Sequence, residues 1–242
     1  MTFGTYPRMS ENPMSYDDVI SLIKFRADPK AIAGMAKFGI NVTRAYGTSI
    51  PSLRAIAKKI GKGNHVLAQE LWKSGIHEAR LLASMIDDYN LVTEEQMEEW
   101  VKDFDSWDIC DQCCSNLFDK TRYAYKKGTE WSSSRDEEFV KRAGFVLMAT
   151  LAVHDKRAKN NVFLQFLPII RKQSTDERNF VKKAVNWALR QIGKRNLDLN
   201  KEAIITSKSI QNIPSASAKW IASNAIRELT SPSVQTRLRS KE

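Results

Sequence analysis

Residues 104–114, FDSWDICDQCC, hold several side chains that could do chemistry. Trp107 and Asp111 are four residues apart, so on a helix they project from the same face, with Asp108 on an adjoining edge. Such a face offers an indole and a carboxylate together. The same pattern also fits an ordinary helix N-terminus, in which Asp108 favours the dipole, Trp107 packs and Asp111 is solvated. The spacing alone leaves both interpretations open.

The three cysteines of the chain, Cys110, Cys113 and Cys114, invite a metal or redox interpretation. They have no distant partner, so a disulfide framework is implausible. A zinc site needs four suitable ligands, and none of the three histidines lies near these cysteines in sequence. A CxxC redox pair normally sits where a strand feeds a helix, and no strand pattern is evident. We therefore expect packing cysteines, with no metal and no cofactor.

A second group of candidates lies in the segment NFVKKAVNWALRQ. Lys183, Trp187 and Arg190 fall at positions i, i+4 and i+7, which gives one helical stripe of cation, indole and cation. Such a stripe suits a phosphate backbone with an aromatic ring against a sugar or base. The alternative is a core tryptophan flanked by solvated basic residues. Lys141 and Arg142, in an earlier and similar segment, are equivalent in phase to Lys182 and Lys183.

Helices must position these residues, because apolar side chains recur at spacings of three and four along most of the chain. The phrases FVKRAGFVLMA, from Phe139, and FVKKAVNWALR, from Phe180, begin 41 residues apart. This period is typical of HEAT and armadillo repeats. We predict an all-α fold, a curved α-solenoid of HEAT-like helical repeats. Basic residues repeated at one phase would make its concave face basic, and a nucleic acid would lie there.

The charge of the chain indicates a class of partner, and its sequence patterns indicate a domain organisation. The net charge of +10 and the pI of about 9.5 suggest a polyanionic partner, nucleic acid first and an anionic membrane surface second. With no transmembrane run or secretory signal, we expect a cytoplasmic protein with no membrane partner. We expect an N-terminal extension over residues 1–14, a single solenoid domain over 15–230 and a flexible basic tail over 231–242. The absence of a heptad seam favours a monomer.

No Ser-His-Asp set, P-loop, HExxH or GxGxxG motif is present, so an enzyme here would work with carboxylates, aromatic rings and cations. The chain resembles the AlkD-type DNA alkylation repair family, the bacterial HEAT-like alkylpurine DNA glycosylases, over residues 15–228. The matching segments are MAKFGINVTRAYGTSIPSLRAIAKKI, ELWKSGIHEARLLA, SWDICD, FVKRAGFVLMA and FVKKAVNWALRQ. WDxxD and the last of these are the most specific.

The resemblance implies roles for individual residues. Trp107 and Trp187 match the two tryptophans of the family's active-site cleft, and Asp111 matches its catalytic aspartate. Arg142 matches a DNA-contacting arginine, and Arg190 stands where the family has a basic residue beside the second tryptophan. Lys141 and Lys183 would join these arginines on the DNA-binding surface. Phe38, also expected at the DNA, falls where the family commonly has a tyrosine, so one hydroxyl contact is lost.

The resemblance also implies a reaction, the excision of N3- and N7-alkylated purines from double-stranded DNA without base flipping. These bases carry a positive charge, so no general acid is needed. An ionised Asp111 would stabilise the oxocarbenium character of the sugar and position water. The protein would then be a DNA glycosylase, associated with the nucleoid.

Two alternatives from other classes stay open. One is a non-catalytic DNA-binding protein of the same family that recognises unusual DNA structure. The other is a protein-interaction scaffold with an incidental basic face. Retention of Asp111 and both tryptophans argues against the first, and salt-dependent DNA binding would argue against the second.

Overall fold

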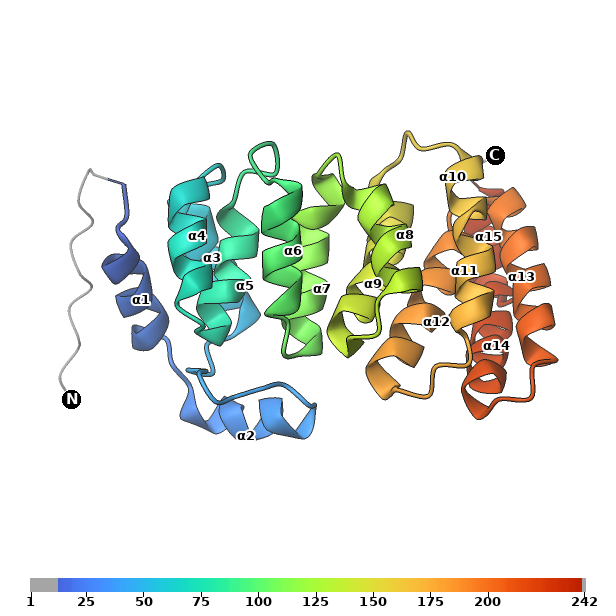
Figure 1. Ribbon diagram of the computed structural model, residues 1–242, viewed down its shortest axis with the longest axis horizontal. Coiled ribbons are helices and arrows are strands. Elements are labelled where there is room, and N and C mark those ends of the chain that lie inside the picture. The colour runs from blue at the N-terminus through green and yellow to red at the C-terminus, as the bar shows by residue number, and fades with distance from the viewer. Residues whose placement is uncertain (1–12, 241–242) are drawn as a thin grey trace. The chain divides into compact units, whose positions relative to one another are not determined.

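The structure, a computed structural model, describes residues 13–240 and is helical throughout (Figure 1). Within that range it contains no strand, so the all-α prediction is confirmed. The chain divides into two compact units, Met1–Asp88 and Tyr89–Glu242. The single domain expected over 15–230 stays a prediction.

The first unit contains short helices, several of which begin at a capping residue that the sequence displays. The Ser15 hydroxyl accepts a hydrogen bond from the Asp18 amide, and the Asp18 carboxylate accepts one from the Ser15 amide, which forms a reciprocal capping box. Ser49 caps the helix that has Pro51 in its first turn. The helices of this unit are α1 (Tyr16–Phe25), α2 (Pro29–Lys37), α3 (Ile50–Ile60), α4 (His65–Lys73) and α5 (His77–Ile86).

A buried carboxylate organises the loop that leads into α3. Glu78, fully buried on α5, accepts hydrogen bonds from the backbone amides of Tyr46, Gly47 and Thr48 at 2.7–3.2 Å. Gly47 has a φ of +79°, and a Cβ there would lie 2.2 Å from the carbonyl oxygen of Asp28. Only glycine fits this turn.

The second unit carries most of the candidate site residues. Thr93 caps its first helix by accepting from the Gln96 amide, as its position before Glu94 and Glu95 indicates. In Figure 1 the unit runs from green to red. Its helices are α6 (Glu94–Lys102), α7 (Trp107–Asn116), the 3-10 turn η1 (Phe118–Lys120), α8 (Ala124–Ser134), α9 (Glu138–His154), α10 (Asn160–Leu164), α11 (Phe166–Gln173), α12 (Asn179–Gly193), α13 (Leu197–Gln211), α14 (Ala216–Leu229) and α15 (Pro232–Arg239).

Helix α9 lies at the centre of the second unit. It packs against α7, α8 and α12, and every residue from Val140 to Ala152 is buried. Gly144 permits the approach of α8, since a Cβ there would lie 2.4 Å from the backbone nitrogen of Ser132. The backbones of α8 and α9 are therefore in direct contact at Gly144.

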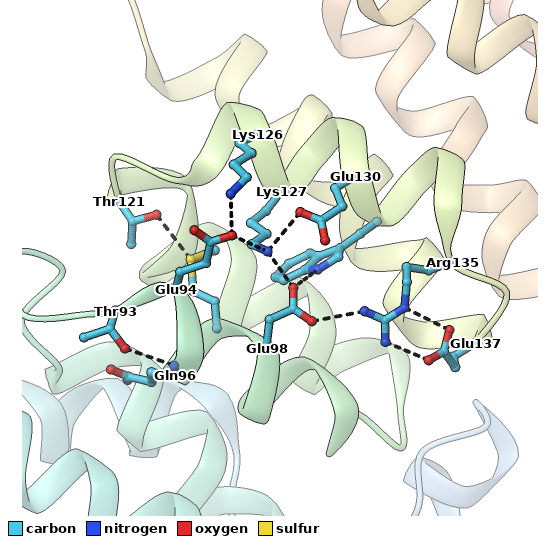
Figure 2. Close-up of polar contacts among 12 residues, drawn as sticks. Thr93, Glu94, Gln96, Glu98, Thr121, Lys126, Lys127, Glu130, Arg135 and Glu137 are labelled. Carbon is cyan, nitrogen blue, oxygen red and sulfur yellow. Dashed lines mark hydrogen bonds and ion pairs between the residues drawn. The ribbon is translucent and has the colours of Figure 1, made fainter.

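A buried lysine joins α6 to α8. The Lys127 side chain is 2% exposed, and its ammonium lies 2.8 Å from Glu94, 2.7 Å from Glu98 and 2.9 Å from Glu130 (Figure 2). The Trp131 indole also donates to Glu98, at 2.7 Å. Glu94 and Glu98 come from α6 and the other groups from α8, so these ion pairs fix one helix against the other.

The end of the chain differs from the flexible tail expected over 231–242. Residues 232–239 form α15, with Val234 and Leu238 buried. Ser231 caps this helix by accepting from the Val234 amide, and Pro232 occupies its first position. The polar composition concealed two apolar residues at a spacing of four. The last two residues, 241–242, and most of the expected 1–14 extension lie outside the described residues.

Candidate active site

Helix α7 begins at Trp107, with Ser106 as its N-cap. Trp107 and Asp111 lie one helical turn apart, as their spacing predicts. Both side chains are half-buried, whereas Ile109 and Cys110, on other sides of the helix, are buried. The Asp111 side chain is 17% exposed. The carboxylate therefore lies at the edge of the core and keeps some access to solvent.

Arg142 holds Asp111 at two points. Its Nε donates to Oδ1 of Asp111 at 2.9 Å and its Nη2 to Oδ2 at 2.8 Å. Its Nη1 donates to the Phe180 carbonyl oxygen at 2.6 Å. Arg142 comes from the first turns of α9 and is 6% exposed, so one buried guanidinium connects α7, α9 and α12. A planar two-point contact fixes the carboxylate's plane as well as its position.

Burial and ion pairing have opposite effects on the pKa of Asp111 and on that of Arg142. Burial raises the pKa of Asp111, the Arg142 guanidinium acts to lower it, and nearby Asp108 adds to the rise. For Arg142, burial acts to lower the pKa, but attraction to Asp111 outweighs it and the pKa is raised. Because a guanidinium does not lose its proton in proteins, Arg142 stays charged and favours the ionised form of Asp111.

Helix α12 carries the predicted stripe of cation, indole and cation. Lys183 is exposed, Trp187 and Arg190 are half-buried, and α12 packs directly on α9. The guanidinium of Arg190 pairs with Glu228 of α14. The rings of Phe139 and Phe180, which open the two repeated phrases, lie 5.6 Å apart at the start of α9 and α12.

The remaining candidates lie apart from this pair. Lys141 is 7% exposed and its ammonium lies 3.2 Å from Asp176. Phe38 belongs to the first unit, where it caps α2 and is 73% exposed. The structure thus joins Asp111 and Arg142 directly and places Trp107 and Trp187 on helices that pack against α9. The DNA-binding roles of the basic residues and Phe38 stay predictions.

The three cysteines pack α7 against α9. Their side chains are buried, and the thiols of Cys110 and Cys114 donate to the carbonyl oxygens of Phe139 and Ala143 at 3.7 and 3.8 Å. Burial, with a contribution from Cys110, raises the pKa of the Cys114 thiol. A protonated, enclosed thiol is a poor nucleophile and metal ligand. Among residues 13–240, no cluster of His, Cys, Asp and Glu is suited to a metal ion.

A family model for the DNA alkylation repair enzyme matches residues 20–229, which is most of the chain. The chain belongs to the DNA alkylation repair enzyme family. The match includes both units and every candidate residue, from Phe38 to Arg190. No curated protein matches the chain.

Solved structures identify the fold of this family member. One protein, described as a member of "a new family of proteins related to the HEAT-like repeat DNA glycosylases with affinity for branched DNA structures", is 19% identical with a TM-score of 0.72. The similarity covers 88% of this chain and 95% of that one. It confirms a HEAT-like repeat fold. A designed armadillo repeat protein bound to a (KR)4 peptide covers 78% of this chain and 80% of its own at 16% identity, but its TM-score of 0.34 is too low to bear on the fold.

One candidate escaped the sequence analysis of this family member. Trp220 on α14 is 42% exposed, and the Lys182 ammonium lies 5.4 Å from the centre of its ring. Trp220 is the fifth residue of α14, as Lys183 is of α12, Arg142 of α9 and Asp111 of α7. This shared register was readable from the segment ASAKWIASNAIR once the helix starts were known. No sequence signal pointed to the pairing of Asp111 with Arg142.

Proposed function

We propose that this protein is a DNA glycosylase that hydrolyses the N-glycosidic bond of cationic N3- and N7-alkylated purines in duplex DNA. The observation that carries the proposal is the Asp111 carboxylate, oriented by the Arg142 guanidinium through bonds of 2.9 and 2.8 Å and still partly open to solvent. Such a group is poised to meet a positive charge that develops beside it. Membership of the DNA alkylation repair enzyme family supports alkylated DNA as the substrate.

Cleavage of this N-glycosidic bond requires few catalytic groups besides the Asp111 carboxylate. An alkylated purine carries a positive charge, so the C1′–N bond breaks with its electron pair moving to the base, and no general acid is required. The sugar then has oxocarbenium character, which the ionised Asp111 stabilises. A preorganised charged group of this kind typically contributes about 3–4 kcal/mol. Water completes the reaction by forming a bond to C1′, and Asp111 positions it and accepts its proton.

The two tryptophans add attraction for the same charge. An indole face beside a cation is worth about 0.5–2 kcal/mol, so each of Trp107 and Trp187 contributes less than the carboxylate. Because Arg142 holds both oxygens of Asp111 from the protein side, the outward lone pairs serve the sugar and water. The lesion would be processed without flipping, which fits a site built on open helix faces rather than a base pocket.

The DNA itself would be held by basic side chains beside this site. Lys183 precedes Trp187 along α12 and Arg190 follows it, and Trp220 extends the register onto α14. Lys141, in the second unit, and Phe38, in the first unit, are the other proposed DNA contacts. The partner is alkylated double-stranded DNA, bound by a monomer that accompanies the chromosome, and the excess of positive charge favours it.

A second candidate function is DNA binding without catalysis. Exposed Trp220 beside Lys182 suits an unpaired base, because an indole stacks on any base face and a cation holds the backbone. The similar protein with affinity for branched DNA structures is in keeping with this. Base release separates the two candidates.

Substitution of Asp111 by Asn tests the catalytic proposal. We expect Asp111→Asn to release 7-methylguanine from methylated duplex DNA at least about 100-fold more slowly than wild type, because one charged group at the transition state is lost. DNA affinity should be kept or improved. Single-turnover rates at saturating protein measure the effect, with circular dichroism to establish the folded fraction.

The matched control is Asp198→Asn, an exposed acid in the first turn of α13, which should release base as wild type does. Release by Asp111→Asn at the wild-type rate would exclude Asp111 as the catalytic carboxylate. Absence of release by the folded wild type, with DNA binding intact, would favour the second candidate.

A further inference from the structure

A pocket of about 360 Å³ opens at the far ends of α9 and α12, within the second unit. Ala152 and Val153 at the end of α9 and Gln191 near the end of α12 form part of its wall. Arg142 lies ten residues before Ala152 on α9, a separation of about 15 Å along the helix axis at 1.5 Å per residue. The pocket is therefore distinct from the Asp111 site.

Positive charge dominates the lining of this pocket. Lys156, Lys194, Arg195 and Arg237 come from the loop after α9, the end of α12 and α15, and no residue that lines the pocket is acidic. Asn196, the N-cap of α13, adds an amide and the positive end of a 15-residue helix. This concentration of positive charge would attract an anion into the pocket.

Two of the cations form a fixed wall. Arg195 donates to the carbonyl oxygens of Ala152 at 3.1 Å and Ala158 at 2.8 Å, and its guanidinium lies 4.4 Å from the centre of the Phe163 ring. Lys194 lies 2.6 Å from Glu228, which is not part of the lining. These contacts hold the two charges in place without filling the pocket.

The other two cations are available to a ligand. Lys156 and Arg237 are exposed, and no described residue forms an ion pair or hydrogen bond with either side chain. They approach the pocket from segments 81 residues apart in sequence, so local packing of a single loop does not explain their convergence. A charged group inside could be gripped by these two side chains against the wall of Arg195.

The chemistry of the lining selects the class of ligand. No aromatic side chain lines the pocket, so nothing there would stack on a base or another flat ring. Arginine and lysine together favour phosphate, whose oxygens accept several charge-assisted hydrogen bonds. We propose that this pocket is a phosphate-binding site that Lys156 and Arg237 close over the ligand.

Two sources could supply that phosphate. One is a free phosphorylated small molecule, and the volume is within the range of small-molecule pockets, about 300–1,000 Å³. The other is the backbone of DNA bound at the Asp111 site, and this source alone rests on the proposed function. Both are recognised by the same cations, and the experiment separates them.

The test uses the full chain as wild type, as Lys156→Gln/Arg237→Gln, and as the control Lys172→Gln/Lys208→Gln. The control removes the same charge from exposed positions on α11 and α13 that do not line the pocket. Inorganic pyrophosphate is titrated by calorimetry, and a fluorescent unmodified duplex is titrated by anisotropy. Equal melting temperatures of the three proteins establish that all are folded.

We expect the pocket variant to weaken binding at least tenfold for one probe or both, with the control within twofold of wild type. Loss for pyrophosphate alone identifies a free phosphorylated ligand, and loss for the duplex identifies the DNA backbone. The proposal is overturned if neither affinity falls further in the pocket variant than in the control. Base release by wild type reports separately on the glycosylase, so failure of either proposal is distinguishable from failure of the other.

Discussion

We propose that Arg142 has a different role from the one that its sequence position suggests. The family resemblance makes it a DNA-contacting residue, but its guanidinium is 6% exposed and engaged with Asp111 and the Phe180 carbonyl. A buried arginine that orients a carboxylate acts through that carboxylate. We therefore treat it as a positioning residue, and the two roles predict opposite kinetics.

Replacement of Arg142 by Lys keeps the charge and loses the two-point geometry. We expect the single-turnover rate of base release to fall about 10–100-fold, in line with small misplacements of catalytic groups. The lysine keeps a positive charge but loses the paired hydrogen bonds that help to lower the pKa of Asp111, so that pKa should rise further and activity should disappear at a higher pH as the medium is acidified. Rate–pH profiles at saturating protein measure both effects.

Lys183→Gln serves as the comparison, since Lys183 is exposed on the neighbouring helix. It should weaken DNA binding and leave the rate and the pH profile unchanged. If Arg142→Lys behaves in the same way, Arg142 is a DNA contact and not a positioning residue.

Sequence reasoning reached Asp111 and Trp107 because a spacing of four on one helix is visible in the letters. The partner of Asp111 is 31 residues away, on a different helix, and nothing in the spacing relates them. Similarly, the sequence predicts three basic residues to be exposed that pair with acids in the structure. The pairs are Lys141 with Asp176, Arg142 with Asp111 and Arg190 with Glu228. Whether a cation faces a partner or the solvent depends on packing between helices.

At the scale of the elements, the pairing of α6 with α8 depends on ionised glutamates. Hydrogen bonds from Lys126 and Lys127 lower the pKa of Glu94 from 4.5 to about 2. The pKa of Glu98 is also lowered, because although burial acts to raise it, bonds from Lys127, Trp131 and Arg135 outweigh that effect. Figure 2 shows these carboxylates converging on one ammonium.

These shifts predict an acid-sensitive contact. Carboxylates with a lowered pKa stabilise the folded protein fully above pH 4.5, and the contribution is lost as the pH falls toward about 2. Lys127→Met removes the ammonium, so the variant should melt roughly 5 °C lower at neutral pH, equivalent to 1–2 kcal/mol in a chain of this size. Between pH 5 and 3 its melting temperature should fall less steeply than that of wild type.

Lys126→Met is the matched control, because Lys126 is an exposed neighbour that reaches only Glu94. It should melt close to wild type at neutral pH. Parallel pH dependence of the Lys127→Met variant and wild type would show that the cluster contributes nothing to acid stability.

Helix boundaries were predictable where the capping residue stands in front of a recognisable apolar pattern. Ser15, Thr93 and the Ser49–Pro51 start are of this kind. Helix α15 has the same chemistry in Ser231 and Pro232, but only Val234 and Leu238 face the core, and two apolar residues in a basic segment resemble a tail. Short terminal helices are stabilised by the surface they pack on, which the sequence does not display.

At the scale of the whole molecule, the excess of ten positive charges is the property that bears on DNA. Several of these cations are paired within the protein, so the number of phosphate contacts is smaller than the charge suggests. Each phosphate contact makes the slope of log affinity against log salt more negative by about 0.9. With three contacts, duplex affinity should fall roughly 40-fold between 50 and 200 mM salt.

Fluorescence anisotropy across this salt range checks the value, and it needs no damaged base. A protein-interaction scaffold would show no such slope. If the affinity for unmodified duplex does not change with salt, the prediction that DNA is the partner is wrong.

The repeat architecture itself was predictable, because the two phrases that begin at Phe139 and Phe180 open the equivalent helices α9 and α12. Their period indicated HEAT-like repeats, and the similar solved structure confirms that fold. The expected basic concave face stays a prediction. Side-chain partners between repeats decide the charge of a face, and a period does not reveal them.

Gly144 links the proposed site to the packing of α9 against α8. It has no side chain, contacts α8 through its backbone, and follows Arg142 by two residues. Any larger residue would push Ser132 away or shift α9, and with α9 the guanidinium that aims Asp111. In a random-mutagenesis screen scored by base release, substitutions at Gly144 would therefore appear beside those at Asp111. Such a screen would identify Gly144 as an apparent catalytic position, although the residue does not contact the substrate.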